Sequence, residues 1–268
     1  METTQHPEVV PSQQAWLPPE QSVSRHMGQR WPAVAAAVGV SAAALGVRHL
    51  ASGDKKPLAR LIRAGGTLLA AASWAYLLVL RRWHLRWGAT DEEIQRPMPA
   101  DELVTRPHLE TTRALTINAP PEAVWPWLVQ MGYRRGGWYS YDRLDNLGVS
   151  SARRIIPELQ NLKVGDKLAP MEGAFIVAAL DPPRSMVLVS RNPKGRITMS
   201  WTFLLEPLEG GRSRFIERIR GRYDFNLVGL LLYLPIEPAD FVMMRKQMLN
   251  LKRRAEQNVE QKRAAAQP

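Results

Sequence analysis

The sequence contains no cysteine, and none of its five histidines lies beyond residue 108. The absence of cysteine excludes disulfides, thiol nucleophiles and cysteine-ligated metal sites. Because the chain after residue 108 has no histidine, it offers neither a Ser-His-Asp triad nor histidine ligands for a metal. Nucleotide-binding glycine patterns and zinc-ligand spacings are also missing. We therefore expect no metal and no cofactor, and any catalysis would depend on carboxylates, tyrosines or lysines.

Charged residues are absent from two N-terminal runs, residues 31–47 and 64–80, each 17 residues long. That length is at the lower end of the roughly 17–25 residues that span a bilayer as a helix. Trp74, Tyr76 and Trp83 lie towards one end of the second run, as interfacial aromatic residues do. Residues 31–86 are therefore expected to form a transmembrane helical hairpin. Two buried helices of a soluble bundle are the alternative.

The net charge of +11 predicts an anionic partner, either lipid headgroups or nucleic acid. Many of the basic residues flank the two apolar runs, which favours membrane lipid and argues against nucleic acid. The loop between the runs contains five Lys or Arg, and the two outer flanks together also contain five, so the charges do not determine the orientation in the membrane.

Composition divides the rest of the chain into a tail, a linker and a folded domain. Residues 1–30 are polar and without an apolar period, which predicts a disordered tail. Residues 87–109 contain Pro97, Pro99 and Pro107, which favour a linker. A folded domain is expected over residues 110–263, followed by a short tail at 264–268.

The folded domain shows one strand, two short helices, several strands and a long helix. Residues 111–118 alternate as a strand does, and a helix is expected to begin at Pro120–Glu122. A short helix or turn follows at 138–147. Strands are expected at 173–180 and 185–191, and the final helix at 238–262. This order predicts an α+β fold with a helix across one sheet.

The clearest hairpin comprises residues 197–205 and 213–223, joined by a turn at 209–211. Apolar side chains occupy the odd positions of both strands, so these positions are expected to face the interior. The even positions of the second strand carry a row of arginines, which is expected to face solvent. This arginine row comprises Arg214, Arg218, Arg220 and Arg222.

Several segments resemble the START-like superfamily known as SRPBCC, which includes polyketide cyclase/dehydrase and lipid-transport proteins. Residues 117–125, INAPPEAVW, are similar to the family's first strand and first helix. Residues 136–146, GGWYSYDRLDN, resemble a bacterial, membrane-anchored and largely uncharacterised subgroup. The segments at 157–160 and 164–166 and the helix at 244–254 also fit.

The resemblance implies a helix-grip fold, in which a curved antiparallel sheet wraps around a long C-terminal helix. It also implies an apolar cavity between sheet and helix that holds a lipid, sterol, quinone, hormone or polyketide-like molecule. Because the family is mostly intracellular, the domain is expected on the cytoplasmic side of the membrane. The residues expected to line the cavity are Trp138, Tyr139, Tyr141, Phe175, Met199, Trp201, Phe203, Phe215, Glu217, Ile219, Tyr223, Phe241, Met244 and Met248. For the aromatic residues among them, plain packing in the core is the alternative.

Two carboxylates are candidates for acid–base chemistry, Glu217 and Asp142. Glu217 shares a strand face with Phe215 and Ile219, so it is expected to point inward unless it pairs with an arginine or lies at the sheet edge. Asp142, like Asp145, either lines the cavity mouth or braces the turn at 138–147.

We expect a membrane-tethered binding or carrier protein for a hydrophobic small molecule. The alternatives are a cyclase- or hydratase-type enzyme that uses cavity carboxylates, and a non-catalytic protein-interaction module.

Overall fold

The computed structural model describes Ser41, residues 57–222 and residues 227–266. The first apolar run, apart from Ser41, and the predicted cavity residue Tyr223 therefore lie outside the described part of the chain. The second run is helical, within α2 (Pro57–Ala75) and the π-helix η2 (Tyr76–Leu80), and α3 (Arg81–Leu85) follows directly. Among the described residues, no helix combines the length and the apolar character needed to cross a membrane.

Five antiparallel strands form one sheet in the order β1-β5-β4-β3-β2. The first strand pairs with the last, so the chain returns to the edge where the sheet began. The strands are β1 (Leu109–Ile117), β2 (Ile176–Asp181), β3 (Ser185–Arg191), β4 (Ile197–Leu208) and β5 (Arg212–Gly221).

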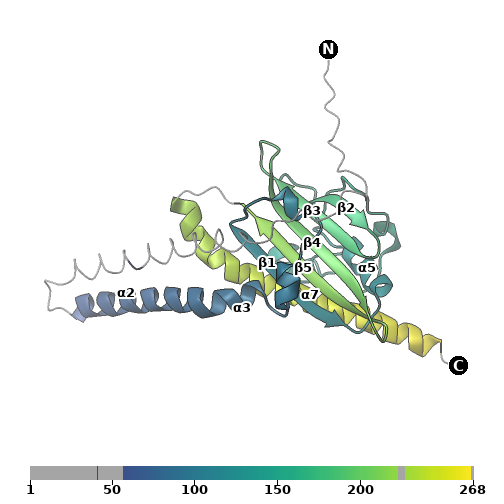
Figure 1. Cartoon of the computed structure of the whole chain (residues 1–268), viewed down its shortest axis with the longest axis horizontal. Helices are drawn as coiled ribbons and strands as arrows, with labels where there is room; N and C mark the ends of the chain where they lie inside the picture. Colours follow the sequence, from purple (N-terminus) through teal and green to yellow (C-terminus); the bar gives the residue numbers. More distant parts are fainter. Residues whose placement is uncertain (1–40, 42–56, 223–226, 267–268) are drawn as a thin grey trace, which may run out of the picture.

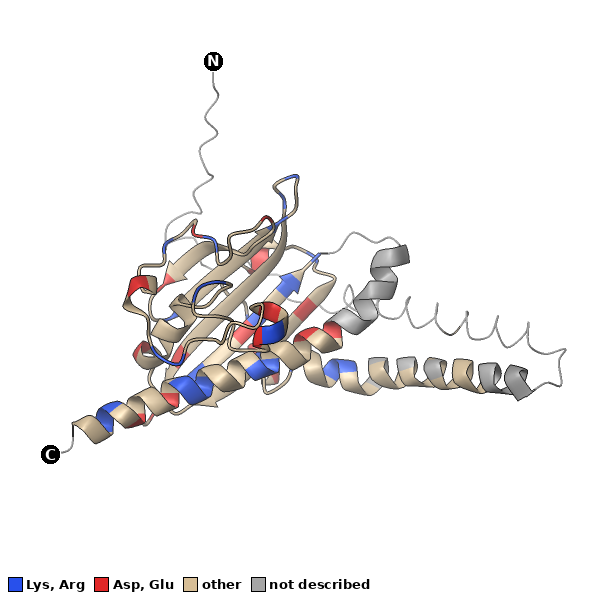
Figure 2. Cartoon of the chain, turned by 180° about the vertical axis from the view of Figure 1, so that it is seen from behind, with Lys and Arg blue, Asp and Glu red and all other residues tan. Residues whose placement is uncertain are grey.

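A long C-terminal helix, α7 (Leu227–Ala265), covers one face of the sheet, as the two opposite views show (Figure 1 and Figure 2). It begins earlier than predicted because the apolar segment before Pro238 is also helical. A strand order of this kind with one long helix across the sheet is the helix-grip arrangement, so the START-like fold expected from the sequence is confirmed. The N-terminal helix α2 projects away from the sheet (Figure 1).

The core lies between the sheet and the helices α5 (Pro121–Val129) and α7. The odd positions of β4 and β5 face this core, as their alternation predicts. Met248, Leu251 and Ala255 on α7 pack against them at helical spacing and are fully buried or nearly so. The short elements are α6 (Asp142–Asp145) and the 3-10 helix η4 (Pro157–Leu159).

The opposite face of the sheet is covered by the segment that the sequence marked as a linker. This segment contains the helix α4 (Asp91–Gln95) and the 3-10 turn η3 (Asp101–Leu103). Its Met98 packs against Ala114, Leu204 and Ile216 of three adjacent strands. The three prolines therefore occur in a segment that packs on the sheet.

The arginine row binds this covering segment, so its expected exposure to solvent is wrong for three of its four members. Arg218 is buried and donates to the carboxylate of Asp101 (2.9 Å) and to the carbonyls of Glu93 (2.7 Å) and Ile94 (3.0 Å). These carbonyls lie near the C-terminal end of α4, where a cation is favoured. Buried Arg220 pairs with Asp101, and Arg214 with Glu93. Only the Arg222 end of the row is exposed.

We expect Arg218→Ala to destabilise the fold by about 3–5 kcal/mol, because it removes the donor to the Glu93 and Ile94 carbonyls and one of the two guanidiniums paired with Asp101. The free energy of unfolding by urea measures this loss. Arg222→Ala, which removes an exposed guanidinium from the same strand face, is the control and should change stability by less than about 0.5 kcal/mol. Equal effects of the two substitutions would contradict the described role of Arg218.

Candidate functional site

Most side chains predicted to line a cavity are packed together between the sheet and α7. The buried members are Tyr139, Trp201, Phe203, Phe215, Ile219, Met244 and Met248, with Trp138, Phe175 and Met199 partly buried against them. Their packing brings together the residues that the sequence grouped. Whether any of them contacts a ligand is not tested by this packing and stays a prediction.

A continuous series of aromatic rings runs through this group. Trp201 on β4 is its centre: it stacks on Trp138 with ring centroids 5.8 Å apart and contacts Phe175 at 5.2 Å. It also contacts Phe203 at 4.8 Å, and Phe203 stacks on Phe215 at 6.1 Å. Such contacts add to the energy of apolar burial and orient the rings. Trp138 and Phe175 form the outer end of this series.

A pocket of about 480 Å³ opens at that outer end. This volume lies within the range of about 300–1,000 Å³ typical of small-molecule sites. Two chain segments form it, the loop and short helix at 133–147 and the loop that precedes β2. The lining residues are Tyr133, Trp138, Leu144, Asp145, Leu147, Ala169, Met171, Glu172, Gly173, Ala174 and Phe175.

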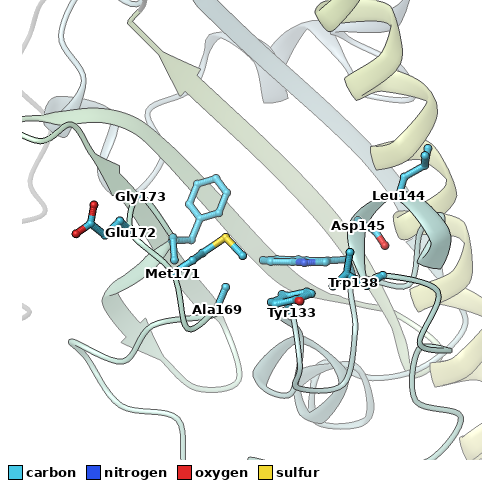
Figure 3. Close-up of a pocket in the computed structure, with 11 residues that line it drawn as sticks. Tyr133, Trp138, Leu144, Asp145, Ala169, Met171, Glu172 and Gly173 are labelled. Carbon is cyan, nitrogen blue, oxygen red and sulfur yellow. The ribbon is translucent and has the colours of Figure 1, made fainter.

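Figure 3 shows how the pocket side chains are arranged. The rings of Trp138 and Tyr133 lie beside each other, and the Met171 side chain reaches towards them from the opposite loop. Glu172 points away from this group, and Leu144 lies on the side nearest α7. The wall is therefore mainly aromatic and aliphatic, which suits an apolar molecule.

Asp145 is one of the two carboxylates that line this pocket, with Glu172. Both of its carboxylate oxygens are buried and lack a hydrogen-bond partner among the described residues. Burial, reinforced by the neighbouring Asp142, raises the pKa of Asp145 above its ordinary value. A carboxyl group of this kind is suited to bind a hydrogen-bond donor of a ligand.

Asp142 braces the turn, which was one of its two predicted roles. Its carboxylate accepts hydrogen bonds from the backbone N–H of Ser151 (3.1 Å) and from the Ser151 hydroxyl. The Ser151 hydroxyl in turn accepts a hydrogen bond from the backbone N–H of Tyr139. Gly137 allows this close approach: its φ is +77°, and a Cβ there would lie 2.3 Å from the Ser151 hydroxyl oxygen. Asp142 does not line the pocket.

Glu217 points into the interior, as the alternation of β5 predicts, and its residue is 0% exposed. Neither carboxylate oxygen makes a hydrogen bond within the described chain. Burial raises the pKa of Glu217 to about 8; the positive charge of Arg113 acts in the opposite direction, and the negative charge of Asp240 adds to the increase. β5 lies between β1 and β4, so Glu217 is not at the sheet edge. It does not line the pocket either.

Arg113 lies directly opposite Glu217 on β1, and the sequence analysis did not identify it. Its buried guanidinium donates to the His84 carbonyl (3.0 Å) and to Asp240 on α7 (3.1 Å). The signal was present in the alternation, because Arg113 shares the inward face of its strand with Leu115 and Ile117.

A second buried ion pair lies nearby, where Arg81 of α3 donates to both oxygens of Glu237 of α7 at 2.8 and 2.9 Å. Tyr76 donates to the same carboxylate at 3.2 Å. Tyr76 also lies 2.8 Å from the imidazole of His84. These contacts connect the N-terminal helices to α7.

The remaining predicted cavity residues have other surroundings. Phe241 contacts the rings of Trp83, His84 and Trp87 at the end of the sheet where α3 packs. Tyr141 is exposed, with the Lys246 ammonium 3.6 Å from its ring centre. The hydroxyl of Tyr139 is occupied, because it donates to the Trp127 carbonyl and accepts from Gln130. In the described part of the chain, no group of three or more acidic or histidine side chains is placed to hold a metal ion.

Comparison with known proteins gives structural neighbours alone. No protein-family model and no curated protein matches the sequence. A Polyketide_cyc-like protein from Corynebacterium glutamicum is 14% identical, with 57% of this chain and 94% of that chain covered and a TM-score of 0.37. A protein from Nitrosomonas europaea is 13% identical, with 60% and 99% covered and a TM-score of 0.36.

An HSP90 activator from Plasmodium falciparum is also similar, at 14% identity and a TM-score of 0.34, with 52% and 94% covered. At these identities the likeness concerns the fold alone. The fold assignment rests on the strand order and the long helix of the chain itself.

The raised pKa of Glu217 predicts a pH-dependent stability. The folded chain keeps a proton that the unfolded chain releases above pH 4.5. The resulting stabilisation is complete below that pH and is lost as the pH rises through about 8. The free energy of unfolding should therefore fall less steeply with rising pH in Glu217→Gln than in the natural chain. The two slopes should differ by at most about 1.4 kcal/mol per pH unit over this window.

Urea unfolding at a series of pH values measures this difference. Asp240 is present in both chains, so the difference between the chains reports Glu217 together with its electrostatic effect on Asp240. Glu209→Gln, an exposed residue in the β4–β5 turn, is the matched control and should keep the slope of the natural chain. A Glu217→Gln slope identical to that of the natural chain would show that Glu217 is ionised in the fold.

Proposed function

We propose that the chain binds a hydrophobic small molecule, such as a lipid, quinone or polyketide-like compound, in the pocket between residues 133–147 and 169–175. The observation that carries this proposal is the pocket itself, whose wall is formed by Trp138, Tyr133, Phe175 and Met171. Asp145 supplies a polar contact for one end of the molecule. The ring series behind Trp138 stabilises the inner wall.

We further propose that the N-terminal segment tethers this site to a membrane, with the domain on the cytoplasmic side. Exposed apolar side chains along α2, η2 and α3 support tethering; they include Leu68, Val79, Leu80 and Trp83. Trp74 donates a hydrogen bond to Ser41 in the first apolar run, which favours a helical hairpin. The cytoplasmic side is inferred from the resemblance described for the sequence.

An enzyme of the cyclase or hydratase type is the second candidate. It is favoured by one observation, the buried carboxyl of Glu217 with a pKa near neutrality. We rank it below binding because neither Glu217 nor Asp142 lines the pocket.

Photolabelling of the full chain with a diazirine-bearing fatty alcohol tests the binding proposal. We expect labelled peptides from residues 133–147 and 169–175. Ala174→Phe fills the pocket and should lower this labelling roughly tenfold, equivalent to about 1.4 kcal/mol of binding free energy. Because the readout is the position of the label, probe that binds to the N-terminal helices does not obscure the result.

Val164→Phe is the control, since it adds the same ring at an exposed position outside the pocket. It should leave the labelling unchanged. Labelling confined to other segments, or unaffected by Ala174→Phe, would contradict binding in this pocket.

A further inference from the structure

The charges in the wall of the pocket are opposite in sign to the net charge of the chain. Lys and Arg number 36 against 25 Asp and Glu, which gives the net charge of +11. The pocket wall nevertheless contains two carboxylates, Asp145 and Glu172, and no Lys, Arg or His. Neither carboxylate forms an ion pair within the described part of the chain. The wall therefore favours positive charge in an otherwise basic chain.

Asp145 is the better placed of these two carboxylates to act on a bound molecule. Glu172 is exposed and points away from the other pocket side chains, so water screens its charge (Figure 3). Both oxygens of Asp145 are buried without a hydrogen-bond partner among the described residues, whereas the oxygens of Asp142 are satisfied by Ser151. A carboxylate withdrawn from water attracts a cation in the adjacent pocket through a medium of low dielectric constant, so the attraction does not require direct contact.

The surroundings of Asp145 leave its charge incompletely compensated. Burial and the negative charge of Asp142 raise the pKa of Asp145, and the positive charge of Lys246 acts in the opposite direction. The Lys246 ammonium, however, lies 3.6 Å from the ring centre of Tyr141 and pairs with neither pocket carboxylate. A cation in the pocket would supply the missing compensation and stabilise the ionised form of Asp145.

An indole ring in the wall completes the features that recognise an alkylammonium group. Among aromatic side chains, tryptophan attracts a cation over its ring face most strongly. Trp138 lines the pocket, and Trp201 stacks on it at 5.8 Å, so one face of the indole is left for other contacts. Tyr133 lies beside Trp138, but the guanidinium of Arg134 is already 5.5 Å from its ring centre (Figure 3). Trp138 is therefore the ring on which we place a cation.

We propose that the ligand of this pocket is a hydrophobic cation, an apolar molecule that carries an amine or quaternary ammonium group. This proposal rests on the proposed binding function and narrows its ligand class. The ammonium group lies against Trp138 with Asp145 as its counter-charge, and the apolar body contacts Phe175 and Met171. A fatty acid is the least favoured ligand, because its carboxylate would add a third negative charge to the pocket.

Competition against the diazirine-bearing fatty alcohol, bound to the full chain in a non-ionic detergent, tests this proposal. The competitors are dodecylamine, dodecanol and dodecanoate, which share one alkyl chain and differ in charge. We expect Asp145→Asn to raise the dodecylamine concentration needed to displace the label from residues 133–147 and 169–175 roughly tenfold. Dodecanol should displace it equally well in both chains. Because each competitor is compared between two chains, its own partition into detergent does not affect the result.

Two further variants are the controls. Asp145→Glu keeps the charge and should keep the affinity for dodecylamine close to that of the natural chain. Glu158→Gln removes an exposed carboxylate outside the pocket and should have no effect. Because Asp145 makes no hydrogen bond that Asp145→Asn would break, the variant should keep the fold, and its labelling by the alcohol probe reports an intact pocket.

The outcomes separate this proposal from the binding function on which it rests. If dodecylamine displaces the label equally well from the natural chain and from Asp145→Asn, the cationic ligand class is wrong while binding in the pocket stands. Stronger competition by dodecanoate in the natural chain than in Asp145→Asn would overturn the cationic class as well. If the alcohol probe labels neither pocket segment of the natural chain, the binding function itself fails.

Discussion

The buried guanidinium of Arg113 is the interaction on which the arrangement of the helices around the sheet depends. A charge without solvent contact must be paired, and here its partners come from separate elements: the His84 carbonyl, Asp240 of α7 and the neighbouring Glu217. The Arg81–Glu237 pair connects α3 and α7 a second time. Glu217, Asp240 and Glu237 outnumber the two guanidiniums of this cluster. Burial raises the pKa of Glu217 and of Asp240, and the neighbouring carboxylates add to this increase. A protonated carboxyl is therefore favoured in this cluster.

The two faces of the sheet differ in chemistry, and this difference places the candidate site. On one face, Arg214, Arg218 and Arg220 form ion pairs with Glu93 and Asp101 of the segment that covers it. The other face carries the aromatic series, which packs under α7 and ends at Trp138 and Phe175. The pocket lies where this series reaches the surface. A mainly apolar wall there, with exposed leucines at its opening, favours a molecule that partitions into lipid.

The alternation of strands and the spacing of helices predicted the regular elements of the fold. The alternation in β4 and β5 placed Trp201, Phe203, Phe215 and Glu217 on the inner face, and the helical spacing of Met244 and Met248 predicted α7. A period assigns side chains to a face but does not say what covers that face, so the arginine row was expected in solvent. Thr90 and Glu93 form a capping box that begins α4, and this local signal within the supposed linker was not used. Most of the pocket lining lies in loops, where no period exists, and so most of it was not predicted.

The central claim is that the chain holds an apolar molecule in the pocket beside Trp138. Native mass spectrometry of the full chain, released from membranes and followed by organic extraction, tests it most directly. The account predicts a mass increase that corresponds to one apolar molecule per chain, recovered in the extract. A chain that shows its bare mass alone, before and after incubation with a total lipid extract, would contradict the account.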